Sequence, residues 1–198
     1  MSETNSCRKE FCGIVLAGGR SRRMGTDKAD ITLGGRTFLE IQVRKLRLLG
    51  AADILISGKQ AFLPGTRCIP DMTPGIGPLG GLMSCFPSAS QRYAVVLGVD
   101  VPLISVSTLE GLLKAHKGGD YDATILSFEG RIEPLIAVYS TYTAGLIKEL
   151  TGSKKLSMKA YIERLHCQLY PFCGDPRELI NCNSPEDLSG LIQDKETI

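Results

Sequence analysis

Residues 14–28, Ile-Val-Leu-Ala-Gly-Gly-Arg-Ser-Arg-Arg-Met-Gly-Thr-Asp-Lys, decide the fold. The apolar run from Phe11 to Ala17, which enters this stretch, has the length of one buried strand. It ends at Gly18-Gly19, where the backbone can take conformations that are closed to other residues. Four cations and a single acid follow, so the loop is locally cationic. A strand that leads into glycines and then cations can place backbone N–H groups and positive charge around a phosphate.

Of three other readings of this loop, one stays open and two are excluded by the spacing of the residues. An ordinary strand-to-loop turn with solvated arginines explains the same residues. A Walker loop is excluded, because no Gly-Lys-Ser/Thr follows at the required spacing. The dinucleotide-binding pattern is excluded as well, since Gly18, Gly19 and Gly25 do not have its spacing.

Length and composition predict one compact domain over residues 1–198, with residues 1–9 flexible. The net charge of +2 argues against nucleic-acid binding, which needs a broad basic face. No apolar run approaches the roughly 20 residues that cross a bilayer. The polar N-terminus is not a signal peptide, so we expect a cytoplasmic protein with no membrane partner.

The seven cysteines form no Cys-x-x-Cys pair and lie beside no histidine at a metal-ligand spacing. Cys12 and Cys68 fall in strand-like runs, where a free thiol behaves as a small hydrophobe. We expect reduced, non-ligand cysteines. A pair between Cys167 and Cys173 stays open, because nothing in the sequence selects or rejects it.

Strand patterns alternate with helix patterns along the chain. Helices are expected after the capping-box pairs Thr37/Glu40 and Ser107/Glu110, and after Ser184-Pro185. The alternation predicts a three-layer α/β/α sandwich around a mostly parallel sheet. The expected strands are 11–17, 31–33, 53–57, 66–69, 93–99, 122–127 and 132–139, and further helices are expected at 79–86, 141–150 and 157–165.

Polar groups follow several of the predicted strands, namely Gly18-Gly19, Ser57-Gly58, Asp71 and Asp100. Ligands in open α/β sheets bind at the carboxyl ends of the strands, where the strand order reverses. Asp100 directly follows a buried apolar strand and is therefore a candidate Mg²⁺ ligand, since Mg²⁺ binds through one or two carboxylates plus substrate phosphates. A helix cap or turn cap is the alternative role for this side chain.

The pattern Leu16-Ala17-Gly18-Gly19-x-Ser21-x-Arg23-Met24-Gly25-x-Asp27-Lys28 resembles the signature of the molybdenum cofactor guanylyltransferases. These are small members of the nucleotidyltransferases that resemble sugar-nucleotide pyrophosphorylases. The resemblance implies the Rossmann-like nucleotide-diphospho-sugar transferase fold, and weaker similarities extend it to the C-terminus. It also implies that Asp100, followed by x-Pro, is the magnesium ligand, with Mg²⁺ as the cofactor.

The same resemblance implies roles for further residues. Lys28 is a nucleotide contact by this resemblance. Its charge could lie over the phosphates with Arg22 or Arg23 assisting, so the candidate catalytic residues are Lys28, Asp100 and Arg22. Ser57 stands where family members carry an asparagine, so a short hydroxyl would replace an amide at that contact. The implied GTP-binding set is Leu16, Ala17, Gly18, Gly19, Lys28, Ser57, Asp71, Gly77, Pro78, Leu79 and Asp100. The implied pterin-facing set is Lys154, Lys155, Asn181 and Asn183, although an exposed helix end explains the two lysines equally well.

The implied reaction is transfer of GMP from GTP to molybdopterin or its molybdenum-bound form, with release of pyrophosphate. A phosphate monoester is mostly dianionic at neutral pH, so the nucleophile needs no strong general base. His116 and His166 are accordingly expected to be structural. The protein must supply positioning and charge neutralisation between two polyanions. Transient contact with cofactor-biosynthesis proteins or target molybdoenzymes is a further expectation.

Three rival functions remain at this point. The Leu-Ala-Gly-Gly motif favours guanine, because the related molybdopterin cytidylyltransferases read Leu-Ala-Ala-Gly. A sugar- or polyol-phosphate nucleotidyltransferase is more distant, since those enzymes carry Gly-Thr-Arg in the loop. A non-catalytic nucleotide-binding protein is the third rival, against which Asp100 and Lys28 argue.

Overall fold

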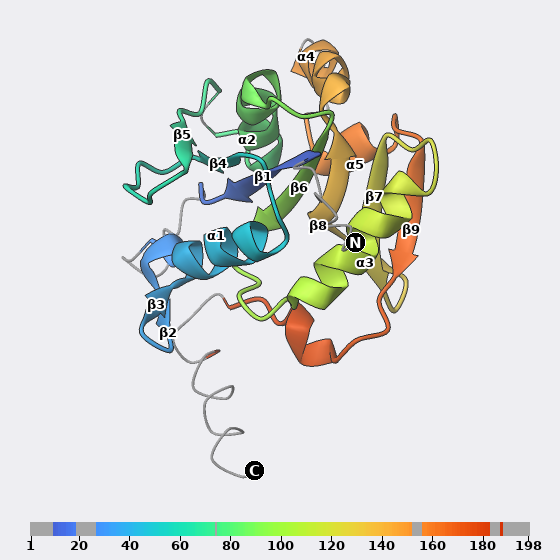
Figure 1. Ribbon diagram of the computed structural model, residues 1–198. Coiled ribbons are helices and arrows are strands. Elements are labelled where there is room, and N and C mark those ends of the chain that lie inside the picture. Colours follow the sequence, from blue (N-terminus) through green and yellow to red (C-terminus); the bar gives the residue numbers. More distant parts are fainter. Residues whose placement is uncertain (1–9, 19–26, 74, 152–155, 183–186, 188–198) are drawn as a thin grey trace, which may run out of the picture.

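The computed structural model describes residues 10–18, 27–73, 75–151, 156–182 and 187 (Figure 1). Its centre is a seven-stranded sheet in the order β5-β4-β1-β6-β8-β7-β9. Only β8 runs against the other six strands, so the prediction of a mostly parallel sheet is confirmed. The strands are β1 (Phe11–Leu16), β4 (Ile54–Ser57), β5 (Arg67–Ile69), β6 (Tyr93–Gly98), β7 (Ala123–Phe128), β8 (Arg131–Ser140) and β9 (Cys167–Pro171).

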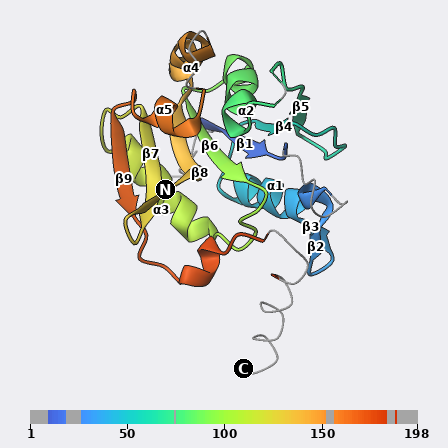
Figure 2. The ribbon, with the colours of Figure 1, turned by 180° about the vertical axis from the view of Figure 1, so that it is seen from behind.

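Helices cover both faces of the sheet, which confirms the three-layer architecture (Figures 1 and 2). One face packs on α1 (Phe38–Leu48) and α3 (Val106–Lys117). The other packs on α2 (Pro78–Cys85), α4 (Ala144–Thr151) and α5 (Met158–Ile162). None of the described helices has the length and apolar character needed to span a bilayer.

The start of α1 follows the predicted capping box. The Glu40 N–H donates to Thr37 Oγ1 at 3.2 Å, and the Thr37 N–H donates to Glu40 Oε2 at 2.7 Å. Thr37 also ends a short antiparallel hairpin of β2 (Thr32–Leu33) and β3 (Arg36–Thr37). Gly34 and Gly35 turn this hairpin with positive φ angles of 59° and 78°, which glycine accepts without strain.

The predicted capping box at Ser107 and Glu110 is wrong. The helix α3 begins two residues earlier, with Ser105 as its N-cap accepting from the Thr108 N–H at 3.1 Å. A distant carboxylate fixes this start, because Glu178 Oε2 accepts from both the Ser105 N–H and the Thr108 hydroxyl, each at 2.8 Å. A contact across 70 residues of sequence leaves no local pattern.

Three further elements differ from the sequence-based expectations. The edge strand β9 was not predicted, because Cys-Gln-Leu-Tyr-Pro has neither a continuous apolar run nor a clear alternation. The expected helix 141–150 is a 3₁₀ turn (Thr141–Thr143) followed by α4, and the expected helix 157–165 shortens to α5. The helix predicted after Ser184-Pro185 and the flexibility predicted for residues 1–9 lie outside the described residues.

The strand order reverses between β1 and β6. From β1 the chain continues outward on one side to β4 and β5, and it then returns to place β6 on the other side. In the parallel register Leu16 pairs with Gly98 and also with Ser57, so these strands end at the same level. The exits of β1 and β6 therefore lie side by side, at the position where α/β sheets bind ligands.

Two glycines meet where β1 and β4 end. Gly58 has a φ of 79°, and a Cβ built there would lie 2.4 Å from Gly18 Cα. A Cβ on Gly18 would likewise lie 3.1 Å from Gly58 Cα. The backbone after β1 can take its path only because neither residue carries a side chain.

We predict that Gly58→Ala destabilises the protein more than Gly65→Ala does. Gly65 also has a positive φ, 69°, but a Cβ there would meet no atom within 4 Å. Both variants therefore carry the left-handed backbone penalty of about 1–2 kcal/mol. Only Gly58→Ala adds the steric overlap with Gly18, which costs about another 1–3 kcal/mol. Urea unfolding measures the two losses, and equal losses would contradict the close contact.

Candidate functional site

A cavity of about 240 Å³ opens at the point where the strand order reverses. The segments that follow β1 and β6 form two of its walls, and the start of α2 and a residue of β8 complete it. Its lining residues are Leu16, Ala17, Gly18, Asp27, Lys28, Gly77, Pro78, Gly98, Val99, Asp100 and Leu135.

Lys28 and Asp100 bring opposite charges together in this cavity. The Lys28 Nζ atom lies 3.8 Å from Asp100 Oδ2, and each side chain is 27% exposed. An ion pair of this length and exposure contributes little to stability. Because both side chains line the cavity and are partly exposed, a bound ligand can reach them. The ammonium group can then bind an anion, and the carboxylate can bind a cation.

The turn that carries Lys28 is held by a second lysine. Lys59 follows β4, and its Nζ lies 3.1 Å from Asp27 Oδ2 and 2.5 Å from Asp30 Oδ2. The pKa of Lys59 is raised, because hydrogen bonds and charge from the two aspartates outweigh the effect of its burial. Asp27 also caps the 3₁₀ turn Lys28–Asp30 by accepting from the Ala29 N–H at 3.0 Å. The turn that carries Lys28 is thus held by the two Lys59 ion pairs and by the Asp27 cap.

Packing at the end of β6 sets the position of the Asp100 carboxylate. A Cβ built on Gly98 would lie 2.6 Å from Asp100 Oδ1 and 3.3 Å from Leu135 Cδ1, so glycine is needed there for the carboxylate to fold back. The Asp100 carbonyl accepts from the Cys182 N–H at 2.8 Å. This bond places the exposed Asn181, a predicted pterin-facing residue, one position from a direct contact with the Asp100 loop.

A second carboxyl group lies near Asp100. Burial raises the pKa of Glu133 in β8, the Asp100 charge raises it further, and Arg131 lowers it. Glu133 belongs to the Glu-Pro-Leu segment that supplies Leu135 to the cavity wall. Two carboxyl groups therefore belong to the β6–β8 side, Asp100 in the cavity wall and Glu133 near it.

The donors around Asp100 fit a hard divalent cation that arrives with a phosphate ligand. Among the described residues, no three His, Cys, Asp or Glu side chains gather into a metal cage. One accessible carboxylate is what Mg²⁺ usually takes from a protein when phosphates and water supply the other ligands. The residues present therefore fit a Mg²⁺ ion that binds together with a phosphate ligand.

The other predicted site residues are distributed as follows. Gly77 and Pro78 line the cavity, whereas Leu79 is fully buried in the core. The Asp71 carboxylate accepts from the Thr73 N–H at 3.0 Å within its own loop. Ser57 is 3% exposed and packs against Gly81, so its hydroxyl faces α2. The predicted residues Gly19, Arg22, Arg23, Lys154, Lys155 and Asn183 lie outside the described part of the chain.

Four cavity residues were not among the predicted site residues, namely Asp27, Gly98, Val99 and Leu135. For three of them a signal was present in the sequence. Asp27 precedes Lys28 in the quoted motif, and Gly98-Val99 directly precedes Asp100. What was missing was the antiparallel position of β8 beside β6, which brings Leu135 to the site.

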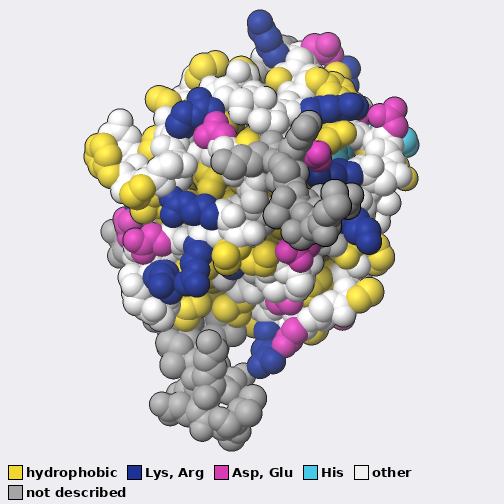
Figure 3. Space-filling model, viewed as in Figure 1, with side chains coloured by type: hydrophobic (Ala, Val, Ile, Leu, Met, Phe, Trp, Pro, Cys, Tyr) yellow, Lys and Arg dark blue, Asp and Glu magenta, His cyan; other side chains and the backbone are white. Residues whose placement is uncertain are grey.

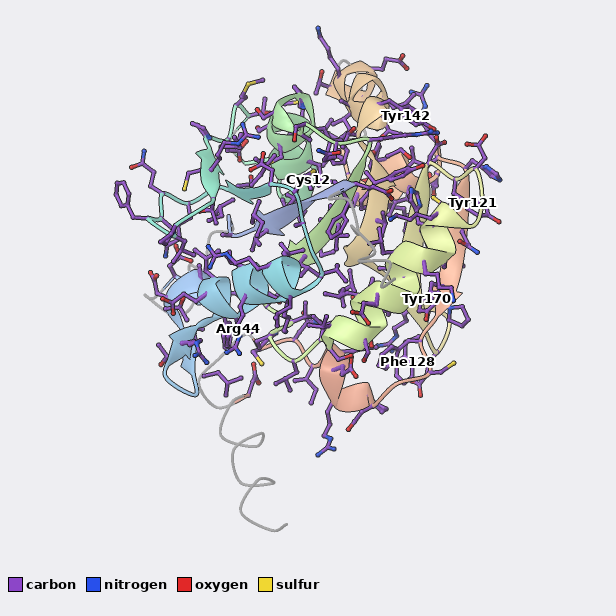
Figure 4. The ribbon with its side chains drawn as sticks, in the orientation of Figure 1. Cys12, Arg44, Tyr121, Phe128, Tyr142 and Tyr170 are labelled. Atoms are coloured by element: carbon purple, nitrogen blue, oxygen red, sulfur yellow. The ribbon has the colours of Figure 1, made fainter. Side chains whose placement is uncertain are left out.

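Neither histidine and none of the described cysteines lines this cavity, although the Cys182 N–H contacts the Asp100 carbonyl beside it. His116 is 1% exposed, its Nδ1 lies 3.0 Å from Thr124 Oγ1, and burial lowers its pKa to about 4. The six described cysteines are free thiols, so Cys167 and Cys173 are not paired. Cys12 lies within the sheet (Figure 4), and burial raises its pKa to about 12, which makes the thiol unreactive.

Charges of both signs are interspersed on the face in Figure 3, and no single basic patch forms there.

Comparison with known proteins gives consistent results. Residues 13–168 match the family model of the MobA-like NTP transferase domain. A molybdenum cofactor guanylyltransferase of Xanthomonas euvesicatoria is 34% identical, with 94% of this chain and 97% of that protein covered. A probable molybdenum cofactor guanylyltransferase of Methanothermobacter thermautotrophicus is 33% identical, with 88% and 95% covered.

Solved structures agree on the fold. A molybdopterin-guanine dinucleotide biosynthesis protein A from Archaeoglobus fulgidus superposes with a TM-score of 0.77 at 22% identity, covering 94% of this chain and 99% of that one. A Mycobacterium tuberculosis protein solved as a complex with manganese gives a TM-score of 0.68 at 15% identity, covering 93% and 98%. With a family model over most of its length and relatives above 30% identity, this chain belongs to the molybdenum cofactor guanylyltransferases, a family of MobA-like nucleotidyltransferase enzymes.

Proposed function

We propose that the protein transfers GMP from GTP to the terminal phosphate of molybdopterin or Mo-molybdopterin and releases pyrophosphate. The observation that carries this proposal is the meeting of Lys28 and Asp100 in one cavity at the reversal of strand order. Family membership supplies the substrate class, because the related proteins are named as guanylyltransferases.

The side chains divide the work of bringing two polyanions together. Gly18 presents bare backbone to the cavity, so a phosphate can approach it closely. Lys28 supplies a compact positive charge for the triphosphate, and Arg22 is proposed to assist it. Asp100 would hold Mg²⁺, which supplies charge neutralisation at the phosphates when bound. The attacking phosphate is already dianionic, so no histidine is required in the cavity.

The remaining contacts extend outward from this centre. Leu16, Ala17, Gly77 and Pro78 form the apolar wall against which we place the guanosine. The Asp71 carboxylate would contact the nucleotide in place of the Thr73 N–H that it now accepts from.

We place molybdopterin, the second substrate, on the side of the cavity where Cys182 contacts the Asp100 loop. The proposed pterin-facing residues are Lys154, Lys155, Asn181 and Asn183. We further propose a single catalytic domain that works in the cytoplasm, in transient contact with cofactor-biosynthesis proteins or target molybdoenzymes.

Asp100→Asn should lower turnover by roughly 10²–10³-fold, because it removes the charge that would hold the metal while keeping the shape of the side chain. The assay follows pyrophosphate release with GTP, molybdopterin and Mg²⁺. Asp120→Asn is the matched control, since the Asp120 side chain is fully exposed elsewhere on the molecule. Near-normal turnover of Asp100→Asn, with an unchanged melting temperature, would refute the metal assignment.

Gly98→Ala should lower kcat strongly while the protein stays folded. The new Cβ would lie 2.6 Å from Asp100 Oδ1, so the carboxylate must move. A displacement on the order of 1 Å can cost about 10²-fold in rate. Gly145→Ala in α4 is the control, because a Cβ there meets nothing within 4 Å. Wild-type kcat in Gly98→Ala would show that the position of Asp100 does not limit the reaction.

Nucleotide selectivity separates the main proposal from the cytidylyltransferase alternative. In thermal shift measurements with Mg²⁺, GTP should raise the melting temperature, whereas CTP, ATP and UTP should not. A nucleotide at 100 times its Kd stabilises the folded state by about 2.7 kcal/mol. Stabilisation by CTP alone would favour the alternative, and GTP binding without pyrophosphate release would indicate a non-catalytic protein.

A further inference from the structure

One buried amide on α1 binds both sides of the Asp100 loop. The Gln42 Nε2 atom donates to the Gly98 carbonyl at 2.8 Å and to the Val101 carbonyl at 3.0 Å. Both partners are acceptors, which fixes the amino group of the amide toward the loop. The two bonds span Val99 and Asp100, so a single side chain sets the separation of the two ends of the turn that carries the carboxylate.

A second contact continues this arrangement one helical turn further along α1. Lys45 donates from Nζ to the Pro102 carbonyl at 2.5 Å. Residues three apart share a face of a helix, so Gln42 and Lys45 reach the same loop together. Arg44, between them in sequence, is exposed instead and is labelled on α1 in Figure 4.

Packing alone gives a poor account of a glutamine at this position. Gln42 is 0% exposed and lies between the apolar residues of the α1 face of the core. Its Oε1 atom accepts no hydrogen bond from the described residues, and a buried acceptor without a partner is unfavourable. A methionine would fill nearly the same volume without that penalty. What methionine lacks is the pair of N–H donors.

We propose that Gln42 is a positioning residue, which holds the Gly98–Val101 turn so that the Asp100 carboxylate is oriented toward the metal–nucleotide complex. This inference rests on the proposed function, because it takes Asp100 as the metal ligand. Gln42 itself does not line the cavity, so it acts through the backbone of the loop.

The test measures Mn²⁺ affinity in the protein–GTP complex by electron paramagnetic resonance, together with the melting temperature and GTP affinity in EDTA. Gln42→Met should weaken Mn²⁺ binding about 10–100-fold, the usual effect of losing a group that orients a metal ligand. Its melting temperature should fall only modestly, because the Gly98 and Val101 carbonyls lose this donor, and its metal-free GTP affinity should be unchanged. Gln168→Met is the matched control, since Gln168 is a partly buried glutamine that accepts from Thr124 Oγ1 at 3.2 Å.

Unchanged Mn²⁺ affinity in Gln42→Met would overturn the proposal, as would a loss of affinity that Gln168→Met shows equally. Gln42→Leu provides a second donor-free variant, and failure of both variants to fold would assign residue 42 to stability and overturn the proposal too. Asp100→Asn, measured alongside, keeps the two hypotheses distinguishable. Loss of Mn²⁺ in Asp100→Asn but not in Gln42→Met leaves the proposed function intact, whereas full Mn²⁺ affinity in Asp100→Asn refutes the metal assignment itself.

Discussion

The equal length of two neighbouring parallel strands is the constraint on which the site depends. Leu16 and Gly98 are register partners at the ends of β1 and β6, so the chain leaves both strands at one level. The two exits carry groups of opposite charge, which come within 3.8 Å at Lys28 and Asp100. The strand order reverses at this pair, where α/β sheets leave a crevice, and the cavity lies at this point.

Close backbone packing converts this topology into a defined shape. Gly18 meets Gly58 where β1 and β4 end, and Gly98 leaves room for the Asp100 carboxylate. Around these points the polar groups of the loops are held from outside the cavity. Lys59 holds the turn that carries Lys28, and Gln42 holds the turn around Asp100. The groups in the cavity are therefore positioned by bonds that leave them open to a ligand.

The sequence predicted the parts of this account that depend on local pattern. The apolar runs of β1 and β6 are long and continuous, so their burial and the charges at their exits followed from the residues alone. The capping box at Thr37 was visible for the same reason. The start of α3 was not, because it depends on Glu178, and the edge strand β9 has too weak a pattern to be distinguished from a loop.

The predicted roles of the site residues are less evenly supported by position. Lys28 and Asp100 share the cavity, whereas Ser57 turns its hydroxyl toward α2, because Gly81 leaves space on that side. Helical spacing from Phe38 and Leu46 places Gln42 on the mostly apolar face of its helix, but the role of this glutamine could not be recognised from sequence. Its role depends on how α1 lies against a loop that is 56 residues away.

The most direct test of the central claim is a crystal structure with Mg²⁺ and a GTP analogue that carries a methylene group between its α- and β-phosphates. The account predicts Mg²⁺ bound by Asp100, with the phosphates beside Gly18 and the Lys28 Nζ atom. A nucleotide bound outside this cavity, or a metal held without Asp100, would contradict it.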